Sequence, residues 1–139
     1  MSLTMKQGIR PQDEPASATE YLAAEKASQN FRHFMNVLNR SALSRRSYRQ
    51  GVRLSVIPVL EGGNHKRLHY HAVIDCPDEE LRGRFPSKIE SAWAETKWGY
   101  HQIDIQSAAD SGWINYISKL KDKPNYADSI DWENYHVSD

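Results

Sequence analysis

The chain of 139 residues has one cysteine, no net charge and no long apolar run. The single cysteine, Cys76, excludes an internal disulfide and a zinc site built from several cysteines. No apolar run approaches the roughly 20 residues that cross a bilayer, and no signal-peptide pattern is present. These absences predict a single domain in the cytoplasm, without a membrane partner.

The zero net charge conceals an uneven distribution. Residues 21–121 hold 15 Lys+Arg against 10 Asp+Glu, whereas the segment from residue 122 onward is acidic. No acidic residue lies between Arg40 and Leu60, a stretch that carries Arg45, Arg46, Arg49 and Arg53 among serines. Arginine and serine side chains suit phosphate contacts, so this run is a candidate nucleic-acid surface. An exposed helix end is the alternative interpretation.

The segment Arg67–Asp75 alternates in a way that predicts a β-strand. Leu68, Tyr70, Ala72 and Ile74 would share one face, and Arg67, His69 and His71 the other. With a rise of about 3.3 Å per residue, the two histidines lie about 6–7 Å apart at their Cα atoms and can converge on one cation. Half-buried histidines with no metal are the alternative.

Residues 52–61 predict a second strand, followed by the turn signal Gly62–Gly63–Asn64. The two strands should form an antiparallel hairpin, and the first of them should lie at an edge or carry a bulge, because Pro58 has no N–H to donate. Pairing the apolar faces of the two strands places Glu61 on the histidine face, near Arg67 and His69. Glu61 is therefore the candidate third ligand.

The remaining segments complete the expected organisation of the chain. Residues 1–16 are expected to be flexible, a folded domain spans 17–123, and 124–139 form an acidic tail that can pack back on the body. A helix is expected from Ser17 or Thr19, because Ser17-x-x-Glu20 has capping-box spacing, and its core stripe includes Phe31 and Phe34. A later helix starts at Pro86. A third strand covers 100–106, where Gln102 and Asp104 remain alternative ligands or partners of the ligands.

The segment from Ser107 to about Lys123 predicts another helix, which Pro124 ends. Trp113, Ile117 and Leu120 form its apolar stripe. Tyr116 and Lys119 are three residues apart and therefore neighbours on the helix surface. A tyrosine beside a solvated lysine can equally be an ordinary surface pair.

Taken together, two short motifs resemble those of the HUH endonucleases, specifically the single-tyrosine replication initiators of rolling-circle elements. His69–Tyr70–His71 is similar to the His-hydrophobic-His motif, and Tyr116–Ile117–Ser118–Lys119 is similar to the Tyr-x-x-Lys motif. The motifs occur in the family's order, and the resemblance covers most of residues 50–123. Two departures are that Tyr70 is large for its position and that no short motif fixes the third ligand.

The resemblance implies an α+β fold, with a ferredoxin-like central antiparallel sheet and flanking helices. The helices and strands expected here lack one or two strands of that sheet, which residues 1–16 or the tail could supply. It also implies a nuclease domain without a helicase, a divalent cation (Mn²⁺ or Mg²⁺) held by His69, His71 and Glu61, and Tyr116 as nucleophile with Lys119 beside it. Single-stranded DNA, at an origin or hairpin, would be cut through a 5′-phosphotyrosine in the cytoplasm or nucleoid, with Arg67 and the basic run tracking its backbone.

Two other functions fit parts of the pattern. A non-catalytic single-stranded nucleic-acid-binding domain of the same fold would use the basic surface and form no covalent product. A metal-dependent hydrolase would let water attack the phosphate in place of Tyr116. Neither explains why a Tyr-x-x-Lys helix follows the His-x-His strand.

Overall fold

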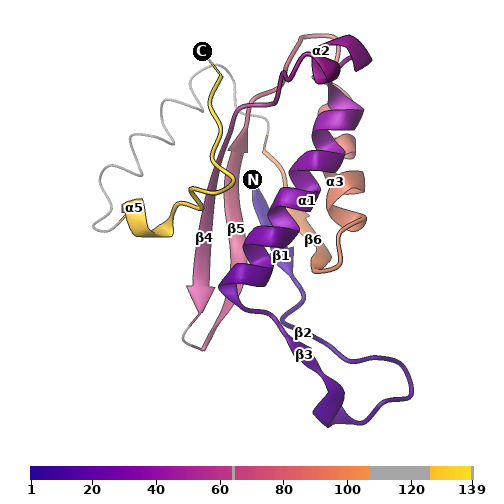
Figure 1. Ribbon diagram of the computed structural model, residues 1–139, viewed down its shortest axis with the longest axis vertical. Helices are drawn as coiled ribbons and strands as arrows, with labels where there is room; N and C mark the ends of the chain where they lie inside the picture. The colour runs from indigo at the N-terminus through magenta and orange to yellow at the C-terminus, as the bar shows by residue number, and fades with distance from the viewer. Residues whose placement is uncertain (64, 107–125, 139) are drawn as a thin grey trace.

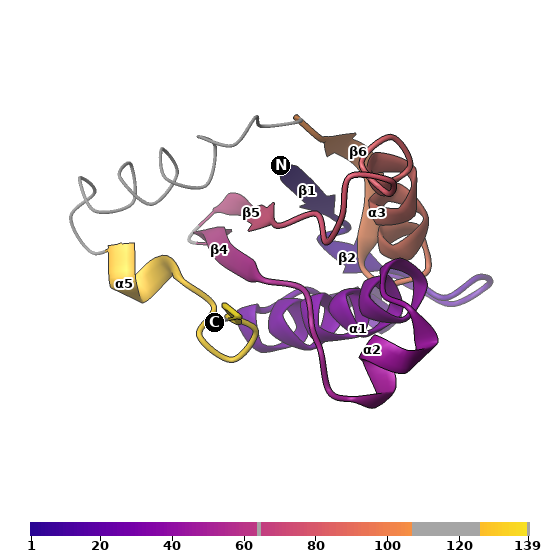
Figure 2. The same ribbon diagram turned by 90° about the horizontal axis from the view of Figure 1, so that it is seen from above.

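A four-stranded antiparallel sheet with the strand order β4-β5-β1-β6 organises the computed structural model, which describes residues 1–63, 65–106 and 126–138. Its strands are β1 (Ser2–Met5), β4 (Val56–Gly63), β5 (Lys66–Ile74) and β6 (Gly99–Asp104). The longer helices α1 (Ala24–Ala42) and α3 (Phe85–Ala94) lie together on one side of this sheet (Figures 1 and 2). The predicted α+β fold is confirmed, and the arrangement is compatible with the ferredoxin-like HUH fold.

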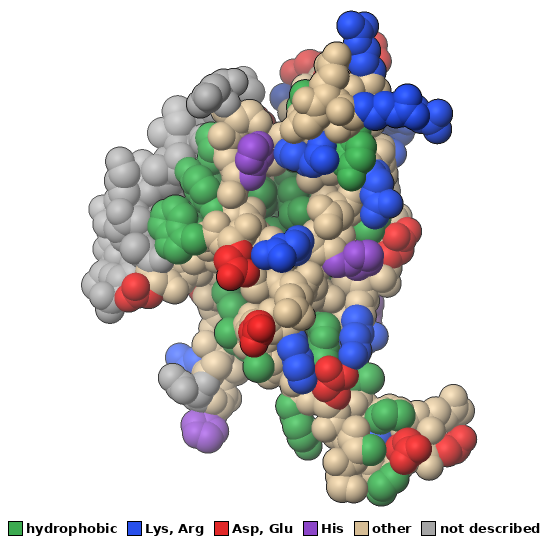
Figure 3. Space-filling model, viewed as in Figure 1, with side chains coloured by type: hydrophobic (Ala, Val, Ile, Leu, Met, Phe, Trp, Pro, Cys, Tyr) green, Lys and Arg blue, Asp and Glu red, His purple; other side chains and the backbone are tan. Residues whose placement is uncertain are grey.

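Smaller elements surround this body. The short helix α2 (Arg45–Arg49) follows α1, and α5 (Tyr126–Ser129) precedes the C-terminal segment. The strands β2 (Gly8–Ile9) and β3 (Glu20–Tyr21) form a separate two-stranded sheet, with a 3-10 turn at Ala16–Ala18 in their connection. These two strands and their connection form an arm that projects from the body (Figures 1 and 3). None of the described helices is long and apolar enough to cross a membrane.

Residues 1–16 do not form the flexible lead-in that we predicted. β1 lies inside the sheet, between β5 and β6, and Leu3 and Met5 are fully buried. This segment therefore supplies the strand that was missing from the predicted order, and the folded unit starts near residue 2, before the expected boundary at 17. Four residues are too few for period-two alternation to stand out in a sequence, which is why β1 was missed.

The start of the first helix also differs from the prediction. α1 begins at Ala24, and its N-cap Ala23 makes no side-chain cap hydrogen bond. The expected capping box at Ser17 and Glu20 does not form, because Glu20 belongs to β3. Its carboxylate instead pairs with Lys97 at 2.6 Å and with Lys26 at 3.3 Å, and the hydrogen bonds from these lysines lower the pKa of Glu20.

The core lies between the helical layer and one face of the sheet. The Phe31 ring contacts Tyr70 at 4.5 Å and Phe34 at 5.3 Å between centroids, and Phe34 meets Trp93 edge-on at 5.2 Å. The predicted α1 stripe and the buried side of α3 are both confirmed by this cluster. Each such side chain contributes about 1.5–3 kcal/mol through burial, so the helical face of the sheet carries most of the stability.

The C-terminal segment packs along the outer edge of β4, as the sequence allowed. Bridges join Val59 to Ile130 and Val56 to His136. The backbone N–H of Asp131 donates to the Pro58 carbonyl at 2.9 Å. Because Pro58 has no N–H, it fits only where β4 faces away from β5, and the predicted edge position of this strand is confirmed.

Candidate metal centre

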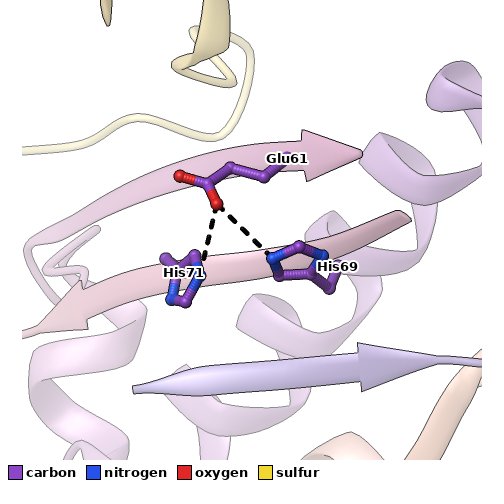
Figure 4. Close-up of side chains that lie close together, drawn as sticks. All are labelled: Glu61, His69 and His71. Carbon is purple, nitrogen blue, oxygen red and sulfur yellow. Dashed lines mark ion pairs between the residues drawn. The ribbon is translucent and has the colours of Figure 1, made fainter. Parts of the chain in front are cut away.

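Two histidines and one glutamate converge on the face of the sheet opposite α1 (Figure 4). The Oε2 atom of Glu61 lies 3.4 Å from Nε2 of His69 and 3.3 Å from Nε2 of His71. One ligand atom from each residue lies within 4.8 Å of the others, so this group, called the metal triad below, could hold a metal ion. No other group of three such residues in the described parts of the chain meets this criterion.

The register of the β4–β5 hairpin brings the triad together. Glu61 pairs directly with His69, and Val59 pairs with His71, so all these side chains share a face. Leu60 pairs with Tyr70 on the opposite face. This register is the one expected from matching apolar faces.

A glycine bulge ends the ladder next to Glu61. Gly62 has φ of +103°, and the register shifts between Glu61 and Gly63. A Cβ atom on Gly62 would lie 2.1 Å from the carbonyl oxygen of Arg67, so only glycine fits this close approach of the two backbones. The Gly-Gly turn thus fixes where β4 stops and leaves Glu61 as its last regularly paired residue.

The orientation of the His69 ring has a defined cause. Its Nδ1 lies 3.0 Å from the Arg67 carbonyl oxygen, and a neutral imidazole that donates from Nδ1 keeps its lone pair on Nε2. That Nε2 is the atom that faces Glu61. Metal-binding histidines commonly have such a carbonyl partner on the other ring nitrogen, which holds the ring and fixes the tautomer.

The triad is open to solvent but not fully exposed. The side chains of Glu61, His69 and His71 are 32%, 31% and 40% exposed. On β1, the residues opposite the two histidines are Ser2 and Thr4, whose side chains are short. Partial exposure and small neighbours leave the ligand atoms accessible to a cation and to a substrate. The polar-apolar alternation Ser2–Leu3–Thr4–Met5 is the only sequence signal for these neighbours, and it was not used.

The alternative ligands on β6 lie farther away. Asp104 pairs with Ser2, which in turn pairs with His71, so β1 separates Asp104 from the histidine strand. Two strand spacings amount to about 9–10 Å. Asp104 is on the histidine face, yet the geometry favours Glu61 as the third ligand, and Gln102 on the same strand is no nearer.

Arg67 lies on the histidine face and is held on two sides. Its guanidinium donates to the Met5 carbonyl at 3.1 Å and lies 6.0 Å from the centre of the Tyr100 ring. Sequence reasoning identified Arg67 but not Tyr100. The alternation of residues 100–106 places Tyr100 on the face of Gln102 and Asp104, which was the available signal.

The other predicted DNA-contacting arginines lie elsewhere. Arg45, Arg46 and Arg49 are on α2, which is on the same side of the sheet as α1, away from the triad (Figure 2). Arg53 has a local role, because its guanidinium donates to the Tyr48 and Val52 carbonyls at 3.0 and 2.7 Å and stacks 4.1 Å above the Tyr48 ring. The structure therefore does not bring the basic run and the triad together.

The predicted nucleophile Tyr116 and its neighbour Lys119 lie outside the described residues. Among the described residues, the buried tyrosine nearest the triad in sequence is Tyr70, which lies between the two histidines on β5 and points into the core. Its hydroxyl donates to Asp131 at 2.8 Å, and burial and this carboxylate raise its pKa well above the usual range. Tyr70 is thus a structural residue.

Comparison with known families gives one match. The model of the replication-associated protein ORF2 family matches residues 3–125. No curated protein and no solved structure matches significantly. The matched range starts in β1 and includes both the triad and the segment with Tyr116, and a replication-associated family indicates a nucleic-acid partner.

Proposed function

Because the chain belongs to the replication-associated protein ORF2 family, we propose that it is a metal-dependent endonuclease of the HUH type that starts replication by nicking single-stranded DNA. The observation that carries this proposal is the convergence of Glu61, His69 and His71 on one point of an open sheet face. The order of the two motifs and the family's role support it. Nicking would take place at an origin or hairpin, through a covalent bond to Tyr116.

The donor set fits a divalent cation. Two imidazole nitrogens and one carboxylate oxygen suit Mn²⁺ or Mg²⁺, and they would also accept Zn²⁺, Co²⁺ or Ni²⁺. The carbonyl of Arg67 holds His69 in the tautomer that a ligand needs. When bound, such a cation polarises the scissile phosphate and offsets its developing negative charge.

The chain's own residues would carry the covalent step. The Tyr116 oxygen attacks phosphorus and forms the phosphotyrosine bond, while the bond to the 3′ oxygen breaks and that oxygen leaves as a hydroxyl. The phenol proton passes to a base or to solvent, since a free phenol has a pKa of about 10. Lys119 would offset charge on the phosphate, and Arg67 would contact the backbone of the strand. The reverse reaction would rejoin the strand.

A labelling experiment tests this proposal. The protein is mixed with a pool of end-labelled single-stranded oligonucleotides, with Mn²⁺ or with EDTA, and run on a denaturing protein gel. We expect a Mn²⁺-dependent labelled band at the mass of protein plus DNA. It should vanish in Tyr116→Phe and persist in the matched variant Tyr126→Phe.

The other outcomes are also informative. A band lost in Tyr126→Phe but retained in Tyr116→Phe would move the nucleophile to Tyr126. Cleavage without any labelled protein would mean that water attacks the phosphate. Binding without cleavage across origin-derived oligonucleotides would favour the non-catalytic binding domain.

A further inference from the structure

Cationic side chains from three helices meet at one end of the helical layer. α1 ends near Arg40, α2 carries Arg45, Arg46 and Arg49, and α3 starts after Arg84 and includes Lys88. The Lys88 ammonium donates to the Ser41 carbonyl at 3.1 Å, which ties the start of α3 to the end of α1. We call these six residues the helical basic surface. Figure 3 shows Lys and Arg side chains gathered at this end of the molecule.

This surface is not neutralised by neighbouring acids. None of its six cations makes an ion pair with another residue in the described ranges. Arg82, just before α3, differs in this respect because it pairs with Glu79 at 3.1 Å. All five arginines of the surface are exposed. Unpaired, exposed cations from three elements create a positive field that attracts a polyanion.

A shallow cavity between α1 and α3 lies within this surface. It has a volume of about 350 Å³, and its lining includes Ser41, Ser87, Ser91, Arg84 and Lys88, with Glu95 as its one acidic residue. Serine hydroxyls, lysine, arginine and a helix N-terminus are the groups that most often contact DNA phosphates. The cavity therefore offers hydrogen-bond donors beside the cations.

The surface lacks what a single strand requires. Proteins that bind single strands stack the bases on exposed aromatic rings. The described residues of the helical basic surface include no aromatic residue, and the nearest ring on α2, Tyr48, is half-buried beneath the Arg53 guanidinium. Phosphate contacts without stacking suit a duplex, whose bases are already paired and stacked.

We propose that the helical basic surface binds the phosphate backbone of double-stranded DNA, at a site separate from the metal triad. The triad lies on the opposite face of the sheet, so the two sites can engage different parts of one substrate. A duplex held here would keep the protein beside a single-stranded segment that reaches the triad. The duplex contact itself requires neither a metal nor Tyr116.

Duplex binding in EDTA tests the proposal without any cleavage. The binding constant of a short labelled duplex is measured by fluorescence anisotropy over a range of salt concentrations. Arg45→Gln/Arg46→Gln/Arg49→Gln is compared with Lys6→Gln/Arg10→Gln/Lys66→Gln, which removes the same charge from exposed positions elsewhere. Each lost phosphate contact lowers the slope of log K against log salt by about 0.9, so the first variant should lose about 2–3 from the slope and the control much less.

A second pair of substitutions tests the contribution of the other helix. Arg84→Gln/Lys88→Gln should lower the slope by about 1–2, because two further cations of the same surface are removed. Equal slopes for the surface variants and the control would overturn the proposal. An equal loss of affinity for a short single strand would also overturn it, because the surface would then not prefer a duplex. Thermal melting of every variant shows that the fold is retained.

A separate arm keeps this proposal distinct from the proposed function. The Mn²⁺-dependent labelling of a short single strand by the surface variants should equal that of the unaltered protein, because the triad is untouched. Failure of the unaltered protein to label DNA would refute the nicking function. The duplex slopes would still decide the role of the helical basic surface.

Discussion

The two faces of β5 have opposite properties, although their residues alternate along one strand. Tyr70 and Ala72 are completely buried against the helical layer, whereas the side chains of His69 and His71 are 31% and 40% exposed. The helical face holds the aromatic cluster, and the histidine face holds the metal triad. One face therefore stabilises the fold while the other is free to carry polar, reactive groups. Substitutions on the two faces should separate metal binding from stability.

The largest expected effect comes from removing a ligand on the histidine face. His71→Ala should reduce Mn²⁺-dependent nicking at least about a thousandfold, or about 4 kcal/mol, because the cation loses one of three protein ligands. The free energy of unfolding should change by no more than about 0.5 kcal/mol, since the side chain is half-exposed. Calorimetric titration with Mn²⁺ and urea unfolding measure the two quantities.

The matched control for that variant is His33→Ala, which removes an exposed histidine from α1. It should leave Mn²⁺ binding unchanged. If His71→Ala bound Mn²⁺ as tightly as His33→Ala does, Glu61, His69 and His71 would not be the metal ligands.

The helical face should give the reverse result. Phe31→Ala removes a fully buried ring that contacts both Tyr70 and Phe34. Loss of burial and the resulting cavity should cost about 3–4 kcal/mol of unfolding free energy. Mn²⁺ affinity, measured under conditions where the variant stays folded, should fall less than about threefold. A large loss of affinity in the folded variant would mean that the two faces are coupled.

The strands that carry the site were predictable because they are long. Alternation over residues 67–75 placed both histidines on one face, and matching the apolar faces of the hairpin put Glu61 opposite His69. These inferences need only the period of a strand and a turn signal. They were sufficient to give the triad.

Contacts between distant segments were not predictable in the same way. β1 has four residues, too few for a period, and its place depends on the edges that β5 and β6 offer. The capping box at Ser17 and Glu20 failed because lysines from α1 and the α3–β6 connection bind the Glu20 carboxylate. The separation of Arg45, Arg46 and Arg49 from the triad depends on which side of the sheet α1 packs.

The hairpin turn tests how the histidine face depends on backbone geometry. Gly62→Ala would place a Cβ atom 2.1 Å from the Arg67 carbonyl at φ +103°, so about 2 kcal/mol of stability should be lost. Glu61 precedes this residue, and Mn²⁺ affinity should fall about tenfold as its carboxylate moves. Gly51→Ala is the control, because φ there is +87° but nothing lies within 4 Å of the new atom. It should cost about 1 kcal/mol and leave Mn²⁺ affinity intact, and an equal loss of affinity in both variants would contradict the account of the turn.

The smallest expected effect concerns the hydroxyl of Tyr70, which lies between the two histidines in sequence but binds the C-terminal segment. Asp131 also accepts hydrogen bonds from Asn134 at 2.7 Å and Ser28 at 3.1 Å, so it remains satisfied without the tyrosine. Tyr70→Phe should therefore cost only about 1 kcal/mol near neutral pH. Urea unfolding at pH 7 measures this cost.

Alkaline pH should reveal the Tyr70 hydroxyl more clearly. Burial, and then the Asp131 carboxylate, raise the pKa of Tyr70 in the folded state above its usual value of about 10. Above that pH the unfolded chain releases this proton while the folded chain keeps it, so the stability contribution is complete below about pH 10 and declines as the pH rises further. Tyr70→Phe should lose less stability between pH 9 and 11 than the unaltered protein does, and the exposed control Tyr135→Phe should behave like the unaltered protein. Identical pH dependence in Tyr70→Phe would mean that the hydroxyl also titrates freely in the folded state, and the contact that joins β5 to the C-terminal segment would then be absent in solution.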